Sequence, residues 1–303
     1  MSSAAPIPRR PLGRTGESVS CLGVGGFHLS MPSQPEALRI IHAAIDAGID
    51  FLDNCWSYAE GESERRMGLA LRGGWRNRAF LMTKIDGRTA AAATAQLEQS
   101  LSRLGTDHLD LLQFHEIIRD SDPDRIFAAG GALEAVLRAR EQGKLRFIGF
   151  TGHKSPMIHR KMLRTAAANG FRFDTVQMPL NVMDAHHDSF EKLVLPELVA
   201  DEVGVLGMKP MGDPFILDSH AASAVECLHY AMSLPVSVTI TGIDAIRILD
   251  QAIAIGRGFQ PLTAAERAAL LARTASAAKG GRFERYKSSQ HFDSTVKHPE
   301  YLG

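Results

Sequence analysis

The sequence predicts a closed (β/α)8 barrel, a single α/β domain, and three observations support this fold class. Eight short apolar segments alternate with eight longer segments of helical periodicity. Continuous apolar runs rich in β-branched residues are typical of parallel strands covered on both faces. The length of 303 residues accommodates one barrel of about 250 residues with extensions at its ends. We therefore expect one domain over residues 1–303, with its barrel core at about 10–275.

A doubly wound open sheet is the alternative fold for such an alternation. That fold would need a phosphate-binding G-x-G-x-x-G motif after its first strand. The first apolar run instead ends Gly23-Val24-Gly25-Gly26, which lacks this spacing. The closed barrel is therefore preferred. Its strands are expected at residues 22–26, 49–53, 80–84, 109–115, 147–152, 175–179, 205–209 and 236–242.

The helices follow from apolar residues that recur with helical spacing between start and stop signals. Glycines such as Gly48, Gly105 and Gly170 stand where a periodic segment ends. Helices are expected at residues 34–47, 63–71, 94–104, 126–140, 157–169, 190–201, 222–232 and 245–255. An N-terminal β-hairpin is expected at 10–21, and an extra C-terminal helix with a polar, aromatic tail at 263–303. The tail aromatics could cover the barrel as a lid or dock on its side.

Composition excludes several function classes. The chain has 34 basic and 34 acidic residues, which gives no electrostatic reason to expect nucleic acid or an anionic membrane as partner. Three scattered cysteines indicate a reducing compartment, and no apolar run is long enough for a membrane span or a signal peptide. We expect a cytoplasmic protein without a metal site, and the pair His186-His187 is interpreted as a solvated loop. The oligomeric state is left open.

Three ionisable residues stand at equivalent places on consecutive strands. Asp53, Lys84 and His115 each end an apolar run. Each lies 31 positions beyond the one before, which is the length of one strand–helix–strand unit. Barrel enzymes carry their catalytic groups at the carboxyl ends of the strands. The spacing therefore predicts that these three side chains meet at one rim. Since an unpaired buried charge is costly, Asp53 is expected to pair with Lys84.

Tyr58 lies five residues beyond Asp53, in the loop that follows the second strand. A phenol with an ordinary pKa of about 10 is a poor proton donor at neutral pH. A neighbouring ammonium is expected to lower this pKa by stabilising the phenolate. His115 is expected to add a hydrogen bond to the phenol or to a substrate oxygen. The four residues together predict a general acid–base site.

Several motifs resemble the aldo-keto reductase family over residues 10–275. They are residues 51–58 (FLDNCWSY), 61–64 (GESE), 68–71 (GLAL), 83–84 (TK) and 109–115 (LDLLQFH). The resemblance implies hydride transfer between a nicotinamide cofactor and a carbonyl or alcohol. It implies Tyr58 as the general acid/base, Lys84 and His115 as its assistants, and Asp53 as the partner of Lys84. Trp56 and Glu116 would line the pocket of a small-molecule carbonyl substrate.

The resemblance also implies where the cofactor binds. Gln177 would hold the nicotinamide carboxamide, with Thr151 and Gly152 after the fifth strand. There His153 replaces the usual asparagine or lies beside its position. The pyrophosphate would meet Lys209 and Gly212 after the seventh strand. The adenosine phosphate would lie near Gly242, Arg247 and Gln251. We expect NADP from the habit of the family, with NAD as an alternative.

Two other functions fit parts of the same sequence. The chain could be a cofactor-binding regulatory barrel with little turnover. It could also be a lyase that uses Lys84 for Schiff-base chemistry, although a partner such as Asp53 opposes the neutral amine. The identity of the substrate is left open.

Overall fold

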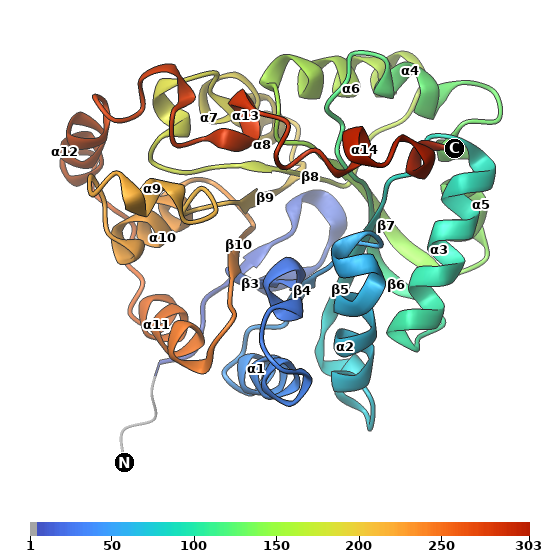
Figure 1. Ribbon diagram of the computed structural model, residues 1–303, viewed down its shortest axis with the longest axis horizontal. Coiled ribbons are helices and arrows are strands. Elements are labelled where there is room, and N and C mark those ends of the chain that lie inside the picture. Colours follow the sequence, from blue (N-terminus) through green and yellow to red (C-terminus); the bar gives the residue numbers. More distant parts are fainter. Residues whose placement is uncertain (1–4) are drawn as a thin grey trace.

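The computed structural model describes residues 5–303 and contains a closed barrel of eight parallel strands surrounded by helices (Figure 1). Each strand pairs with its neighbours in chain order, and β10 closes the barrel on β3. The predicted fold class is therefore confirmed. The barrel strands are β3 (Leu22–Gly25), β4 (Phe51–Asp53), β5 (Phe80–Ile85), β6 (Leu109–Phe114), β7 (Leu145–Thr151), β8 (Thr175–Pro179), β9 (Gly204–Met208) and β10 (Val238–Gly242).

Two hydrophobic layers hold the barrel together. The larger layer lies between the strands and the outer helices, and a smaller cluster fills the interior. The predicted hairpin is present as β1 (Arg9–Pro11) and β2 (Ser18–Ser20). Its Leu12 and Val19 are buried and belong to the interior cluster, together with Phe51 and Phe80. The hairpin therefore packs into the barrel interior and leaves the carboxyl ends of the strands for other segments.

Some of the outer helices begin at a residue whose side chain caps the helix. Ser33 caps α1 (Gln34–Asp46), and Thr89 caps α3 (Ala90–Leu104) four residues earlier than expected. The other helices are α2 (Glu62–Ala70), α4 (Asp122–Phe127), α5 (Ala132–Glu141), α6 (Pro156–Ala168), α7 (Phe190–Leu193), α8 (Leu195–Ala200), α9 (Phe215–Asp218), α10 (Ala224–Ser233), α11 (Ile246–Arg257), α12 (Ala264–Thr274), α13 (Arg285–Ser288) and α14 (Ser294–Lys297).

Two predicted helices are interrupted. The segment predicted at 126–140 forms α4 and α5, because Gly130 has a φ of 72° and Gly131 packs tightly. A Cβ on Gly131 would lie 2.5 Å from the carbonyl oxygen of Ile126. The segment predicted at 190–201 forms α7 and α8, which begins with Leu195-Pro196. Proline has no amide hydrogen for a continuous helix, so it favours a new start.

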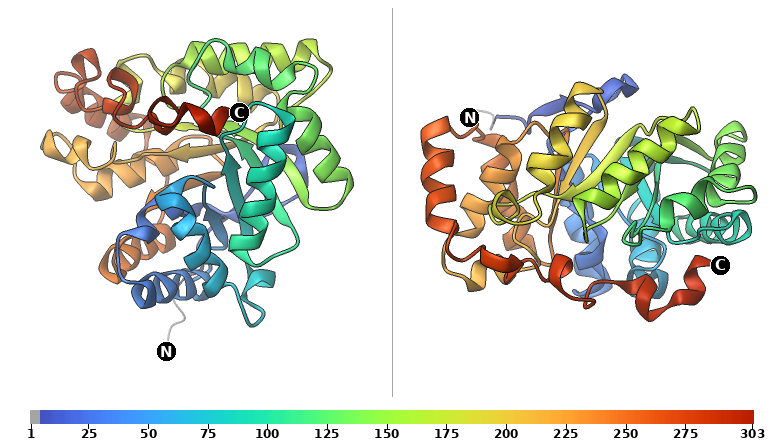
Figure 2. Two further views of the ribbon diagram at one scale, coloured as in Figure 1. Left: turned by 45° about the vertical axis from the view of Figure 1, so that its right-hand side comes forward. Right: turned by 90° about the horizontal axis from the view of Figure 1, so that it is seen from above.

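The C-terminal segment crosses the barrel near the carboxyl ends of several strands (Figure 2). The phenol of Tyr286 meets Asn181 just after β8, and Asp293 meets His153 just after β7. Further along, the side chain of Gln96 in α3 donates to the carbonyl of Tyr301. The tail therefore docks across the mouth of the barrel. Between residues 5 and 303, no helix is both long enough and apolar enough to cross a membrane.

Candidate active site

Asp53 and Lys84 form an ion pair at the carboxyl ends of β4 and β5. The ammonium of Lys84 donates to Asp53 and, over 2.8 Å, to the carbonyl of Asn54. Both side chains are almost fully buried, with exposed fractions of 2% and 5%. Gln177 of β8 donates to the other carboxylate oxygen of Asp53 over 3.0 Å. The predicted pairing is present, and Asp53 links three strands of the barrel.

Tyr58 reaches the same place from the loop after β4. Left-handed backbone conformations at Ala59 and Glu60 reverse the chain directly after it. The Lys84 nitrogen lies 5.0 Å from the centre of the Tyr58 ring, and the His115 ring lies 5.9 Å away in an edge-to-face arrangement. The structure therefore brings together all four residues that the strand spacing and the resemblance had singled out.

The pKa of Tyr58 shifts in the direction opposite to our expectation. Burial raises this pKa well above its ordinary value, and the neighbouring carboxylates of Asp53, Glu116 and Asp86 raise it further. We expected the positive charge of Lys84 to stabilise the phenolate, but Asp53 already compensates that charge. The expectation of a lowered pKa is therefore wrong. The phenol keeps its proton at neutral pH and is available as a donor.

His115 stands directly after β6, with its Nδ1 atom 2.8 Å from an oxygen of Asp86 and 3.3 Å from the sulfur of Cys55. Burial disfavours the imidazolium, but Cys55 and Asp86 outweigh this effect and raise the pKa of His115 well above its ordinary value. The imidazole nitrogen, the Asp86 carboxylate oxygen and the Cys55 sulfur lie within 4.8 Å of one another. The expected absence of a metal site stays a prediction.

A buried arginine that the sequence argument missed ties the two neighbouring loops together. Arg88 is fully buried and donates to the carbonyl oxygens of Asp86, His115 and Glu116 over 2.7–2.8 Å. Its Nε atom pairs with Asp122 at 3.0 Å. Asp86 and Arg88 follow Lys84 by two and four residues, so their place after a buried strand was a signal that could have been used.

Two of the predicted cofactor-binding residues present unpaired polar atoms. Thr151 ends β7 and is the register partner of Gln177 in β8. The hydroxyl of Thr151 and the amide oxygen of Gln177 are buried, and neither has a hydrogen-bond partner among residues 5–303. Because buried polar groups are normally satisfied, these atoms fit a ligand amide. Gly152 packs against the carbonyl of Ile117. The imidazole of His153 is hydrogen-bonded to Asp293 of the tail.

The remaining cofactor positions differ in exposure. Lys209 follows β9, and burial lowers its pKa; its nitrogen lies 5.6 Å from the Tyr286 ring and 5.0 Å from the Phe292 ring. Gly212 has a φ of 61° in the turn beyond Lys209, and Gly242 is the last residue of β10. Arg247 and Gln251 are exposed on α11, one helical turn apart. Lys209, Gly212 and Gly242 therefore lie near the mouth of the barrel, whereas Arg247 and Gln251 lie on its outer surface.

The two predicted pocket residues both contact the tail. Trp56 donates its indole N–H to Gln99 over 2.7 Å and packs edge-on against Tyr301. Glu116 has a left-handed backbone conformation. Its carboxylate accepts hydrogen bonds from the amides of Ser294 and Thr295 and from the Thr295 hydroxyl over 2.7–2.8 Å. Glu116 thus anchors the tail in this conformation.

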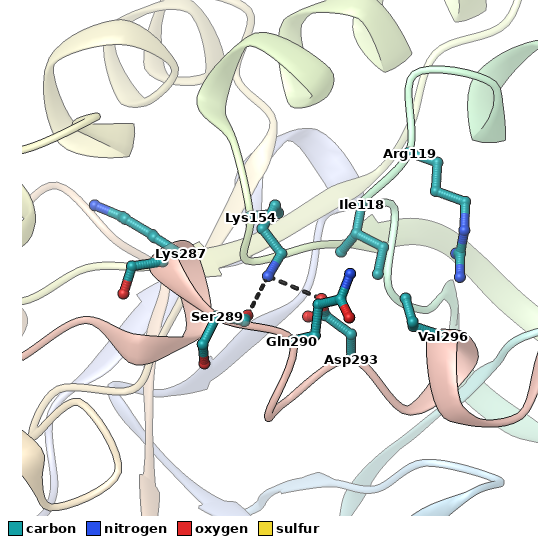
Figure 3. A pocket seen from close by; sticks show the side chains of 9 residues that line it. Ile118, Arg119, Lys154, Lys287, Ser289, Gln290, Asp293 and Val296 are labelled. Atoms are coloured by element: carbon teal, nitrogen blue, oxygen red, sulfur yellow. Dashed lines mark hydrogen bonds and ion pairs between the residues drawn. The ribbon is translucent and has the colours of Figure 1, made fainter.

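A cavity of about 410 Å³ lies between the tail and the loops that follow β6 and β7 (Figure 3). Lys154 points into it and donates to Asp293 over 2.8 Å and to the carbonyl of Ser289 over 2.5 Å. Asp293 also holds His153, so the cavity borders the segment that covers the barrel mouth. Its lining residues are Ile118, Arg119, Lys154, Lys287, Ser288, Ser289, Gln290, Asp293 and Val296.

A closed barrel whose strand ends gather a phenol, an ammonium, an imidazole and a carboxylate has the architecture of a (β/α)8 enzyme. The chain belongs to the aldo/keto reductase family, because the sequence model of that family matches residues 21–226. Membership of this family implies an oxidoreductase that acts on carbonyl groups with a nicotinamide cofactor.

Solved structures share the fold of this chain. The holo form of an aldo-keto reductase from Bacillus halodurans has a TM-score of 0.73 and 20% identity, over 91% of this chain and 99% of the other. Two structures of candidate aldo-keto reductases from Pseudomonas aeruginosa have TM-scores of 0.68 and 0.66, each at 24% identity. They cover 85% and 84% of this chain, and 97% and 96% of theirs. At these identities the likeness shows the fold alone.

Proposed function

We propose that the chain reduces an aldehyde or ketone, or oxidises the corresponding alcohol, with NADP(H) and with Tyr58 as the general acid/base. The observation that carries this proposal is the convergence of Tyr58, His115 and the buried Asp53–Lys84 pair at one end of the barrel. When bound, the nicotinamide supplies or accepts the hydride at the carbonyl carbon. The protein's part is to position the carbonyl and to manage the proton on its oxygen.

In the reducing direction, Tyr58 donates its phenolic proton to the carbonyl oxygen, which gains negative charge during the reduction. The ammonium of Lys84 and the imidazolium of His115 stabilise the negative charge, first on the substrate oxygen and then on the phenolate. Asp53 holds the ammonium in place, and Gln177 of β8 in turn donates a hydrogen bond to Asp53. The phenol regains its proton from solvent after the alcohol forms. In the oxidising direction, the same groups act in reverse.

The chain's own residues fit the cofactor at several points. The unpaired hydroxyl of Thr151 and amide oxygen of Gln177 would bind the nicotinamide carboxamide. Gly152 would let the chain turn beside them, Lys209 and Gly212 would meet the pyrophosphate, and Gly242 would border the adenosine half. Arg247, with Gln251 on the same face of α11, would contact the extra phosphate of NADP, while NAD remains the alternative cofactor.

The proposed substrate is a small carbonyl compound that enters beside Trp56 and Glu116. Because the tail contacts both residues, its position would shape the entrance. We also propose a single domain over the whole chain and a cytoplasmic location. The location rests on three cysteines that are free and buried, as a reducing compartment would keep them.

The direct test mixes the purified protein with NADPH or NADH and a panel of small aldehydes and ketones, and follows the absorbance of the reduced nicotinamide. We expect oxidation that requires both a carbonyl compound and the protein, and is faster with NADPH. Binding of cofactor without turnover of any compound would instead favour the regulatory barrel. Schiff-base chemistry at Lys84 is disfavoured, because Asp53 and Asn54 both engage its nitrogen.

A further inference from the structure

We infer that Asp86 is a positioning residue for His115: it binds Nδ1 of the imidazole and thereby presents Nε2 to the carbonyl oxygen at the barrel mouth. Its catalytic consequence rests on the proposed function, whereas the contact itself does not. Asp86 lies just beyond β5, two residues after Lys84, and its carboxylate oxygen is 2.8 Å from Nδ1 of His115. Asp86 is fully buried, while the side chain of His115 keeps an exposed fraction of 10%.

The loop that carries Asp86 is fixed from both sides. The amides of Asp86 and Gly87 donate to the side-chain oxygen of Gln96 over 2.8 and 2.7 Å. The guanidinium of Arg88 binds the carbonyl oxygens of both Asp86 and His115. These contacts join the ends of β5 and β6 at a set distance. The Asp86–His115 contact is therefore part of a rigid arrangement, as a group that orients a catalytic ring requires.

The charges around His115 favour the imidazolium. Asp86 and the thiol of Cys55 meet its Nδ1 edge. The phenol of Tyr58 packs edge-to-face against its ring, and Arg88 approaches only its carbonyl oxygen. Glu116 follows it in the chain but is engaged by the tail, and the ion pair of Lys84 with Asp53 is internally compensated. The pKa of Asp86 falls below its ordinary value, since His115 and Arg88 together outweigh the effect of burial.

Two consequences follow for the ring. The N–H at Nδ1 donates to Asp86 in both protonation states, so the neutral ring is held in a single tautomer. The negative charge of Asp86 also keeps the ring cationic to a higher pH. Nε2 is then a charged donor for an oxygen that gains negative charge during the reaction. A neutral partner in place of Asp86 would leave the ring in position but would no longer favour its positively charged form.

The test compares the wild type with Asp86→Asn, with ¹⁵N-labelled histidine followed by NMR over a pH range. His115→Gln assigns the His115 signals among the 12 histidines. We expect the titration midpoint of His115 to fall by at least about one pH unit in Asp86→Asn. We also expect the neutral wild-type ring to carry its proton on Nδ1. An unchanged midpoint, or a neutral ring protonated on Nε2, would overturn the inference; the second reading needs no variant and so does not depend on how Asp86→Asn folds.

Glu64→Gln is the matched control, because Glu64 is also a fully buried carboxylate but bonds to Thr83 and Arg103 instead of His115. The His115 midpoint should not move in this variant. In turnover assays, Asp86→Asn should move the alkaline limb of the kcat profile to lower pH, with kcat reduced about tenfold or more and little change in KM. If the alkaline limb of the kcat profile does not move in Asp86→Asn, Asp86 does not act on catalysis through His115. Absence of turnover in the wild type would refute the proposed function, while the NMR result would still decide the contact.

Discussion

Asp53 and Lys84 form a buried ion pair that joins adjacent barrel strands, and the other oxygen of Asp53 binds Gln177 across the barrel. Lys84→Met should therefore cost about 3–5 kcal/mol of unfolding free energy, because it leaves a carboxylate buried without its partner. The double variant Asp53→Asn/Lys84→Met should recover much of this stability but none of the lost turnover. Urea unfolding and steady-state kinetics measure the two quantities separately. Wild-type turnover in the double variant would remove the pair from the mechanism.

Arg247 is exposed on α11, where the extra phosphate of NADP is proposed to bind. Arg247→Gln should raise the Kd for NADPH about tenfold or more through the loss of a charge-assisted hydrogen bond. The Kd for NADH should stay the same, because NADH lacks this phosphate. Calorimetric titration with both dinucleotides makes the comparison, and Arg257→Gln at the other end of α11 is the control. Equal weakening of both cofactors would show that Arg247 does not distinguish them.

Glu116 accepts three hydrogen bonds from Ser294 and Thr295, which fixes the tail over the barrel mouth. Glu116→Gln should accelerate hydrogen exchange at the amides of both tail residues by at least about tenfold, because hydrogen bonds to charged groups are the stronger ones. Hydrogen-exchange mass spectrometry resolves this segment. The tail variant Glu300→Gln changes an exposed carboxylate and should have no such effect. Unaltered exchange in Glu116→Gln would mean that other contacts hold the tail.

Glu284 lies in a buried cluster with Tyr286, Lys287 and Asp184. Burial raises its pKa from 4.5 to about 7, with Lys287 opposing the shift and Asp184 adding to it. Since the folded state binds this proton more tightly than the unfolded chain, its contribution to stability is complete below about pH 4.5 and is lost as the pH rises through 7.

Glu284→Gln should therefore lose less stability between about pH 5 and pH 8 than the wild type, by a difference on the order of 3 kcal/mol. Guanidinium unfolding at the two pH values measures it. Glu141→Gln, which changes an exposed carboxylate at the end of α5, should follow the wild type. A Glu284→Gln variant with the same pH dependence as the wild type would contradict the raised pKa.

The barrel and the meeting of Asp53, Lys84 and His115 were predictable because both follow from a repeating local pattern. Strands of similar length, separated by one helix each, bring equivalent residues to the same rim. The pKa direction of Tyr58 was not predictable in this way. Its ring is affected by burial and by carboxylates from several loops, and neither quantity can be read from the spacing of residues along the chain.

Contacts between distant segments also escaped the sequence argument. The hydrogen bond from the amide of Thr295 to Glu116 joins residues 179 positions apart, and no local sequence pattern links them. Asp86 and Arg88 were not among the predicted site residues, although the structure buries both fully. The interruption between α4 and α5 was signalled by Gly130-Gly131, but the apolar periodicity continued through it and favoured a single helix.

The central claim is that the phenol of Tyr58 transfers the proton during carbonyl reduction, and Tyr58→Phe under single-turnover conditions tests it most directly. The variant removes one oxygen and keeps the ring that packs against Phe27 and His115. We predict that the rate of NADPH oxidation by a small aldehyde falls at least about 100-fold, while the Kd for NADPH stays within about twofold of the wild type. A Tyr58→Phe variant that oxidises NADPH at the wild-type rate would contradict this mechanism.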